Sequence, residues 1–305
     1  MIINLPCSSR RLFGAASLAV LLSSTLPTGL LAQDQPIRIG FPNQTEQAML
    51  GYMAALIIER QLGLEVELTP NLGGTGIGQT AIIEGALDIF PDYTGDALAN
   101  VLKEDAITDP TAAYDRVASE YLTRYGITWL APTQFNNTYA LALKTELAQE
   151  RSITSISELA PHAGDWTLGS SVEFAARPID GYPGMTSAYG FEFGSIRPMD
   201  IGLMYTSIDA GQVDVIVAFA TDARIGKVGL TVIDDDKFFF PAYNAAITVR
   251  TEVLERHPEI ADAINAVIAN IDTETQIALN GRADIDNIPL DTVAEDYLRE
   301  IGAID

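Results

Sequence analysis

Four aromatic residues in separate short segments have the side chains needed to bind a positively charged ligand. They are Tyr93, Tyr139, Phe219 and Tyr243. A methylated ammonium group cannot donate an ordinary hydrogen bond, so a protein binds it through apolar contact and the negative faces of aromatic rings. Each ring contributes about 0.5–2 kcal/mol, depending on how far the site is desolvated. The four residues predict a cation-binding cage, provided that the fold brings them together.

The alternative is that the four rings are ordinary core aromatics, which are far more numerous than cages. Tyr93 and Tyr139 follow polar or glycine-rich turns at predicted strand edges, so packing alone explains them poorly. Phe219 ends an apolar strand and fits both interpretations about equally. The cage hypothesis predicts that Tyr93→Ala or Tyr139→Ala weakens ligand binding sharply and leaves the fold intact.

The chain begins with the features of an export signal. Arg10 and Arg11 precede an apolar stretch without acidic residues, Leu12 to Ala32, and a polar segment follows from Gln33. This order is typical of a cleaved signal peptide, here residues 1–32. The paired arginines also resemble a twin-arginine motif, which leaves the export route open. We therefore expect an exported protein whose mature chain starts near Gln33.

Composition argues against several classes of function. The formal charge is −23, and it becomes −25 without the two arginines of the signal, so the protein repels nucleic acid and anionic lipid surfaces. Cys7 is the only cysteine and precedes the apolar stretch, so the mature chain should have no disulfide or lipid anchor. The two histidines, far apart in sequence, do not predict a metal site. No serine or cysteine nucleophile accompanies a histidine, so a hydrolase is not expected, and no cofactor is implied.

Strand-like apolar runs alternate with helix-like segments along the mature chain. The first unit has predicted strands at 37–40, 64–68 and 87–90, a predicted helix at 45–62, and a glycine-rich turn at 73–76 that leads into a helix through Glu84. The second unit has predicted strands at 139–143, 166–169 and 213–219 and predicted helices at 185–189 and 202–210. A strand pattern returns at 238–249, and helices are expected from 251 to 301. This alternation predicts parallel sheets covered by helices.

A chain that builds one α/β lobe, crosses to a second and returns to the first has two hinge strands side by side. We expect lobe 1 to comprise residues 33–138 and 242–305, and lobe 2 to comprise residues 139–241. Tyr139 and Tyr243 fall at the two expected crossings, where a ligand between the lobes would contact them.

Seven short motifs occur in an order and spacing that identify a family. They are Asn-Gln-Thr-Glu-Gln at 43–47, Leu-Gly-Gly-Thr at 72–75, Pro-Asp-Tyr-Thr-Gly at 91–95, Phe-Asn-Asn-Thr-Tyr-Ala at 135–140, Asp-Gly-Tyr-Pro-Gly at 180–184, Thr-Asp at 221–222 and Phe-Pro-Ala-Tyr at 240–243. From about residue 37 to its C-terminus, the chain resembles the osmoprotectant-binding subunits of bacterial ABC importers, which capture glycine betaine, choline, carnitine or related compounds.

The resemblance implies a fold, a location and a partner. The implied fold class is α/β, a two-lobed periplasmic-binding-protein fold of type II with two hinge crossings, in which each lobe is a mostly parallel sheet flanked by helices. Ligands of the family lie between the lobes, which close like a hinged clamp. The implied protein is a periplasmic monomer that binds a quaternary ammonium compound and serves an ABC permease in the inner membrane. It is not an enzyme.

The family's aromatic cage falls on the four rings, with Phe219 where tyrosine is common. Asn137 and Thr94, from two of the motifs, are carried over as further ligand-binding residues. Arg177 matches an arginine that holds a ligand carboxylate in relatives, but Pro42 replaces their lysine and Asp96 replaces a threonine.

An aspartate beside a bound carboxylate costs about 1–4 kcal/mol, whereas it accepts a hydrogen bond from an alcohol. Asp96 therefore favours choline over glycine betaine. If Arg177 neutralises Asp96, a binder that prefers glycine betaine or carnitine remains the alternative, and so does a periplasmic ligand sensor of the same fold. Arg177 itself either contacts the ligand or clamps the lobes through an ion pair.

Overall fold

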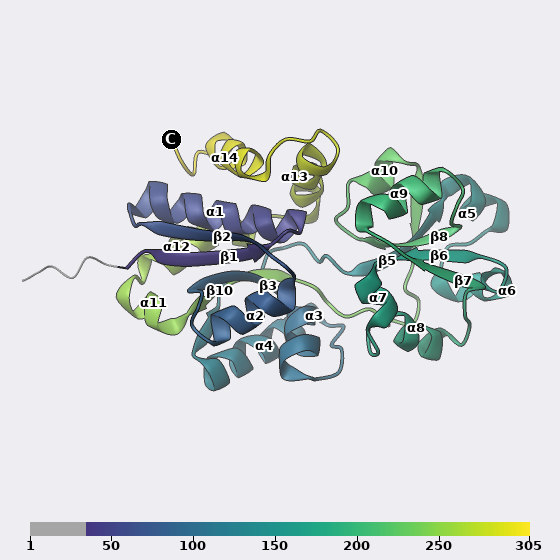
Figure 1. Cartoon of the computed structure of the whole chain (residues 1–305), viewed down its shortest axis with the longest axis horizontal. Coiled ribbons are helices and arrows are strands. Elements are labelled where there is room, and N and C mark those ends of the chain that lie inside the picture. Colours follow the sequence, from purple (N-terminus) through teal and green to yellow (C-terminus); the bar gives the residue numbers. More distant parts are fainter. Residues whose placement is uncertain (1–34) are drawn as a thin grey trace, which may run out of the picture. The chain divides into compact units, whose positions relative to one another are not determined.

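The computed structural model describes residues 35–305 (Figure 1). The predicted signal peptide, residues 1–32, and the predicted mature start at Gln33 lie outside the described residues. Pro36 to Asp305 forms one compact unit.

The strands are β1 (Ile37–Pro42), β2 (Val66–Leu72), β3 (Ile89–Tyr93), β4 (Ile127–Trp129), β5 (Tyr139–Lys144), β6 (Thr167–Ser170), β7 (Ser195–Pro198), β8 (Val215–Phe219), β9 (Leu230–Ile233) and β10 (Ala245–Arg250). The α-helices are α1 (Thr45–Leu62), α2 (Thr75–Ile83), α3 (Thr94–Asp96), α4 (Pro110–Tyr125), α5 (Thr145–Arg151), α6 (Ala160–Ala163), α7 (Val172–Ala176), α8 (Tyr182–Tyr189), α9 (Ile201–Asp209), α10 (Arg224–Lys227), α11 (Thr251–Arg256), α12 (Glu259–Val267), α13 (Thr273–Asp284) and α14 (Leu290–Glu300). A π-helical segment, η1 (Ala97–Leu102), continues α3, and two short 3₁₀ helices are η2 (Ile156–Leu159) and η3 (Ile268–Asn270).

The strands form two separate five-stranded sheets, which confirms the predicted two-lobed α/β fold. The first sheet has the order β2-β1-β3-β10-β4, and the second has the order β7-β6-β8-β5-β9. In the first sheet, β1 pairs in parallel with β2 and β3, whereas β10 runs antiparallel to β3 and β4. In the second, β6 pairs in parallel with β7 and β8, whereas β5 runs antiparallel to β8 and β9. Both sheets are therefore mixed.

Alternate residues of the strands pack into different hydrophobic clusters. In β3, Ile89 joins the cluster that contains the buried face of α1, while Phe90 joins the cluster with Val117 and Tyr121 of α4. In β5, Leu141 and Leu143 pack in one cluster, while Ala142 packs against α9. Because side chains alternate across a strand, each sheet is buried on both faces by helices.

Two segments connect the sheets, and they lie side by side. Asn136 and Asn244 form an antiparallel bridge, and the backbone N–H of Asn137 donates to the carbonyl of Tyr243 at 3.0 Å. The Thr138 hydroxyl donates to the Pro241 carbonyl at 2.9 Å. The expected pair of hinge crossings is therefore present and is held together by hydrogen bonds.

Several predicted boundaries were wrong. Residues 238–244 were predicted as strand, but β10 begins only at Ala245. Phe238 has a φ of 51°, which a strand cannot contain, and Pro241 has no N–H to donate to a sheet. The second strand begins at Val66 rather than residue 64, since pairing with β1 starts there.

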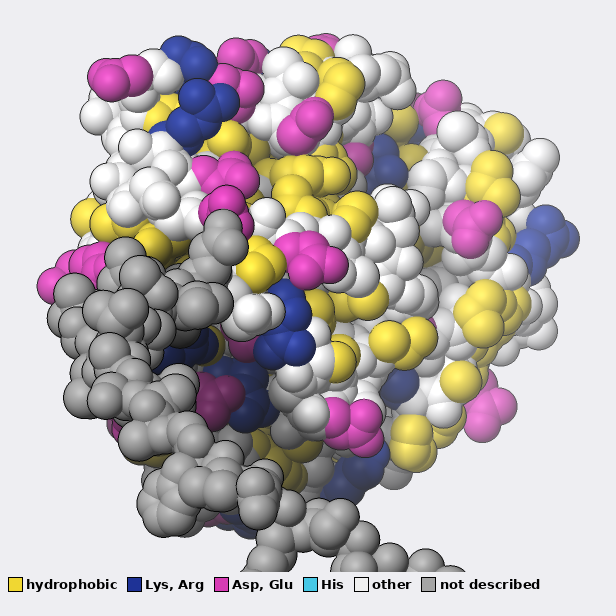
Figure 2. All heavy atoms as spheres, turned by 60° about the vertical axis from the view of Figure 1, so that its left-hand side comes forward, with side chains coloured by type: hydrophobic (Ala, Val, Ile, Leu, Met, Phe, Trp, Pro, Cys, Tyr) yellow, Lys and Arg dark blue, Asp and Glu magenta, His cyan; other side chains and the backbone are white. Residues whose placement is uncertain are grey.

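Charged side chains of both signs are scattered over the face of the protein shown in Figure 2. On the face shown in Figure 2, aspartates and glutamates lie singly among apolar, neutral and basic side chains. Within residues 35–305, none of the helices has the length and apolarity needed to cross a membrane.

Candidate functional site

A pocket of about 260 Å³ is lined by residues from both sheets and from the segments that connect them. The lining includes seven of the predicted site residues: Tyr93, Tyr139, Phe219, Tyr243, Asp96, Arg177 and Asn137. The eighth, Thr94, does not line it. Its buried hydroxyl donates to the carbonyl of Ala242 at 2.8 Å, so Thr94 supports the returning segment instead.

The four predicted rings form a continuous series along the pocket. The ring centroids of Tyr93 and Tyr243 are 6.5 Å apart, those of Tyr243 and Tyr139 are 5.6 Å apart, and those of Tyr139 and Phe219 are 5.3 Å apart. Tyr139 and Phe219 are register partners on the neighbouring strands β5 and β8. Strand pairing and hinge geometry thus assemble the rings from sites far apart in the sequence.

The same rings are also part of the hydrophobic core. Tyr93 and Tyr139 are each 6% exposed, and Tyr243 is 5% exposed. Tyr139 also contacts the rings of Phe174 and Phe240, at centroid distances of 5.0 and 5.9 Å. The cage and core interpretations are therefore compatible, but truncation to alanine would open a cavity that costs about 3–5 kcal/mol. The expectation that an alanine variant leaves the fold intact is not supported by this packing.

A glycine leaves room for the Tyr243 ring at the pocket wall. A Cβ atom placed on Gly95 would lie 2.6 Å from the Tyr243 ring, closer than packing permits. Tyr93 ends β3 and Gly95 lies in α3, which follows directly. The Asp-Tyr-Thr-Gly sequence therefore positions the Tyr93 ring and, through Gly95, leaves space for the Tyr243 ring.

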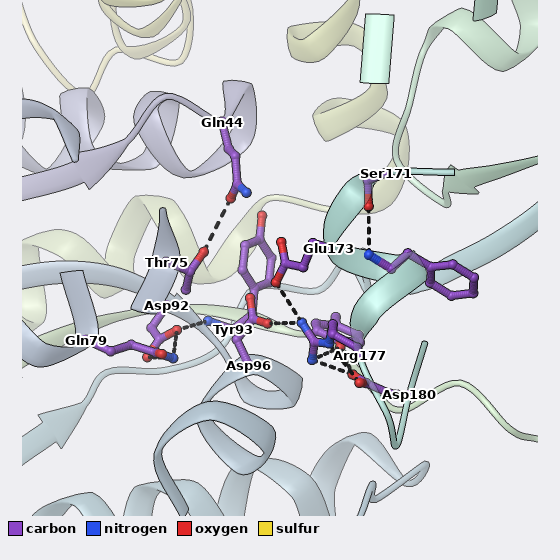
Figure 3. Close-up of polar contacts among 12 residues, drawn as sticks. Gln44, Thr75, Gln79, Asp92, Tyr93, Asp96, Ser171, Glu173, Arg177 and Asp180 are labelled. Atoms are coloured by element: carbon purple, nitrogen blue, oxygen red, sulfur yellow. Dashed lines mark hydrogen bonds and ion pairs between the residues drawn. The ribbon is translucent and has the colours of Figure 1, made fainter. Parts of the chain in front are cut away.

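Arg177 is the centre of a dense polar network (Figure 3). Its Nε donates to Asp180 at 2.7 Å, its Nη1 donates to Asp96 at 2.9 Å and to Glu173 at 3.0 Å, and its Nη2 donates to the Tyr243 hydroxyl at 2.9 Å. Nη2 also contacts the second oxygen of Asp180, and the Tyr243 hydroxyl donates to the same carboxylate. All five N–H groups of the guanidinium therefore have acceptors within the protein.

Asp96 and Arg177 come from different sheets. Asp96 ends α3, directly after β3 of the first sheet, whereas Arg177 directly follows α7, between β6 and β7 of the second. Burial raises the pKa of Asp96 to about 6, although the charge of Arg177 opposes this shift. The ion pair thus joins the two lobes. Because it gives Asp96 a cationic partner, the alternative of a binder that prefers glycine betaine or carnitine stays open.

Glu46 is a pocket residue that local sequence patterns did not predict, although it lies in one of the family motifs. Glu46 is 5% exposed, lies in the first turn of α1 and lines the pocket. One oxygen accepts from the Tyr93 hydroxyl and from the Asn137 amide, the latter at 2.9 Å. The other accepts from the Thr221 hydroxyl at 2.8 Å and from the Asn280 amide at 3.3 Å. An acidic residue in a first turn is usual at a helix N-terminus, so the sequence alone gave no sign of this burial.

A second arginine lies on the pocket wall. Arg224 pairs with Asp222 at 2.6 Å and with Asp284 at 3.4 Å. Asp284 ends α13, which follows the strands of the first sheet, whereas Arg224 begins α10, next to β9 of the second. This ion pair also links parts of the chain that belong to different lobes.

Asp92 is buried just outside the pocket and should make stability depend on pH. Burial raises its pKa from 3.8 to about 8, with a contribution from the charge of Asp96. Between these values the native state binds a proton that the unfolded state has released, so stability falls as pH rises, by up to about 1.4 kcal/mol per pH unit. Urea unfolding from pH 4 to pH 8 should show this slope, and it should be shallower in Asp92→Asn. Equal slopes in both proteins would contradict the assignment.

Residues 35–305 contain no cluster of three or more histidine, cysteine, aspartate or glutamate side chains arranged to hold a metal ion. The chemistry of the pocket is accordingly that of rings, carboxylates and two arginines.

Comparison with known proteins gives consistent results. Residues 35–300 match the family model described as the substrate binding domain of an ABC-type glycine betaine transport system. A glycine-betaine-binding protein of Pseudomonas aeruginosa is 40% identical, over 90% of this chain and 91% of that protein. A carnitine transport binding protein of Listeria monocytogenes is 34% identical, over 92% of this chain and 91% of that protein.

A solved structure agrees with the observed architecture. The crystal structure of a glycine betaine/carnitine/choline ABC transporter protein superposes with a TM-score of 0.78 at 33% identity and covers 88% of this chain and 100% of its own. The relatives are transport binding proteins and not enzymes. This chain therefore belongs to the family of substrate-binding domains of ABC-type glycine betaine transport systems.

Proposed function

We propose that the protein captures a quaternary ammonium compound in the aromatic cage, prefers choline to glycine betaine, and delivers it to an ABC permease in the inner membrane. The continuous series of rings around one pocket carries the proposal. The Pseudomonas and Listeria relatives are named for glycine betaine and carnitine, both of which bear a trimethylammonium group. That group is also the head of choline, so the cage serves all three.

The preference for choline rests on the state of Arg177. A ligand carboxylate needs free N–H donors, but the five donors of this guanidinium already have protein acceptors. To reach Arg177, the carboxylate of glycine betaine must displace Glu173 or Asp96 and lie beside the remaining negative charges. The alcohol of choline carries no charge, and its hydroxyl can donate a hydrogen bond to an aspartate or to Asn137 Oδ1. This buried oxygen accepts no hydrogen bond from any of residues 35–305.

Capture follows from the distribution of the rings. Lobe 1, for which we propose residues 33–138 and 242–305, contributes Tyr93 and Tyr243, and lobe 2, residues 139–241, contributes Tyr139 and Phe219. Closure brings the two pairs together, expels water and strengthens each cation–π contact, so the ligand stabilises the closed form. The permease recognises that form. We place the protein in the periplasm as a monomer, because closure requires both lobes to be free.

Calorimetric titration of the mature protein with choline and, separately, with glycine betaine at one salt concentration tests the proposal. We expect tighter binding of choline. Heat with glycine betaine but not with choline would contradict the preference and leave the cage intact. No heat with choline, glycine betaine or carnitine would contradict the proposed function.

Asp96→Thr provides the matched variant for this titration. The substitution removes one negative charge and frees one Nη1–H of Arg177. We expect the ratio of glycine betaine to choline affinity to rise at least fivefold, which corresponds to about 1 kcal/mol. An unchanged ratio would mean that Asp96 has no part in selectivity.

A further inference from the structure

The pocket is lined by more acidic than basic side chains, and one of the acidic side chains has no basic partner among the described residues. Its carboxylates are Glu46, Asp96, Glu173, Asp222 and Asp284. Asp96 and Glu173 pair with Arg177, while Asp222 and Asp284 pair with Arg224. Among the described residues, Glu46 has hydrogen-bond donors but no cationic partner.

Glu46 is a buried carboxylate that contacts only neutral groups. All four of its hydrogen-bond partners are neutral groups, the side chains of Tyr93, Asn137, Thr221 and Asn280. Two of these are hydroxyls, which can turn and accept a hydrogen bond from the O–H of a protonated carboxyl group. Burial raises the pKa of Glu46, and these hydrogen bonds oppose the shift. A positive charge beside the carboxylate would favour the ionised form.

The bound cation would supply such a charge. Tyr93 both lines the cage and contacts Glu46, so a ligand against the Tyr93 ring lies near the carboxylate. We infer that Glu46 pairs with the positive charge of the ligand and releases its proton to the solvent when the cation binds. This inference rests on the proposed function and adds an electrostatic partner to the cage.

Other titratable or charged groups surround the same space. They are Tyr93 from β3, Tyr139 from β5, Tyr243 from the returning segment, Glu173 from α7, Asp284 from α13, Asp222 and Arg224 from the segment after β8, and the Asp96 and Arg177 pair. The acids of this set are already paired with arginines, so a cation changes their protonation less than that of Glu46. Asp96 is the nearest competitor, because burial raises its pKa to about 6.

Calorimetric titration with choline in phosphate and in Tris at the same pH, near 7, measures proton release. Phosphate and Tris have different heats of protonation, so a released proton makes the observed enthalpy depend on the buffer. We expect this dependence in the wild-type protein and tighter binding as pH rises, because the ionised carboxylate attracts the cation. The neutral isostere 3,3-dimethylbutan-1-ol should bind at least tenfold more weakly and release no proton, since one pKa unit corresponds to about a tenfold change.

Three variants assign the proton. Glu46→Gln should lose the buffer dependence and bind choline about tenfold or more weakly. Asp92→Asn, which replaces another buried acid outside the pocket, should retain both properties, and Asp96→Asn should retain the buffer dependence. The buffer comparison on the wild-type protein tests proton release even if a variant fails to fold.

Two outcomes would overturn the inference while leaving the proposed function in place. One is choline binding to the wild-type protein with the same enthalpy in both buffers. The other is loss of the buffer dependence in Asp96→Asn but not in Glu46→Gln. Absence of heat with choline, glycine betaine and carnitine alike would instead overturn the proposed function, and the inference with it.

Discussion

Replacing Arg177 by alanine is expected to lower the free energy of unfolding by about 3–5 kcal/mol, because it leaves buried carboxylates without their cation. Asp180 is 3% exposed at its side chain and takes two donors from the guanidinium, and the Asp96 side chain is 12% exposed. Urea denaturation at pH 7 measures the loss.

Glu173→Gln is the matched control for this variant. Its carboxylate also pairs with Arg177, but its side chain is 53% exposed, so the pair is screened and is worth no more than about 1 kcal/mol. A loss below 1 kcal/mol in Arg177→Ala would show that water reaches Asp180 and Asp96 once the guanidinium is gone. The network would then be a surface feature and not a buried support of the cage.

Replacing Tyr139 by leucine is expected to weaken choline binding about tenfold, within the range of one cation–π contact. Leucine keeps most of the apolar volume among Phe174, Phe219 and Phe240, so the cavity is much smaller than alanine would leave. Calorimetry measures affinity, and thermal unfolding confirms that the variant is folded.

Tyr139→Phe separates the ring from its hydroxyl. It keeps the π face, and the hydroxyl makes no hydrogen bond with any described residue, so we expect affinity within about threefold of the wild-type protein. Equal affinity in the leucine and wild-type proteins would show that the Tyr139 ring does not contact the cation. Equal losses in the leucine and phenylalanine variants would assign the role to the hydroxyl.

Local sequence patterns predicted several of the regular elements, but not α4, β4, β7 or β9. The helix expected at 45–62 is α1 with the same bounds, since its apolar positions recur with helical spacing and Gly63 ends it with a φ of 68°. The segment 238–244 was missed because an apolar run with strand composition adopts a different backbone when it must cross between lobes. Amino-acid composition alone does not distinguish a strand within a sheet from a segment that connects two lobes.

The site likewise has residues that local motifs predict and residues whose contacts depend on distant parts of the chain. The rings were found because motifs marked them individually, and chain topology brought them together. Glu46 was missed because its environment comes from Thr221 and Asn280, which lie 175 and 234 residues away. The saturation of Arg177 likewise depends on the conformations of its partners, among them Asp180 and Tyr243. Such properties arise from packing and not from local pattern.

The bridge between the two connecting segments restricts how the lobes can move. Asn136 and Asn244 tie the outgoing and returning strands together, and Thr138 and Pro241 add a second tie. Because the two connecting segments are hydrogen-bonded to each other, they bend together. The lobes then rotate relative to each other about a single axis, and independent twisting of either lobe is suppressed. A rotation of this kind keeps the internal geometry of each lobe fixed. Substitution of a hinge residue that does not line the pocket, such as Thr138, should therefore alter how often the binding protein closes without altering which ligand fits.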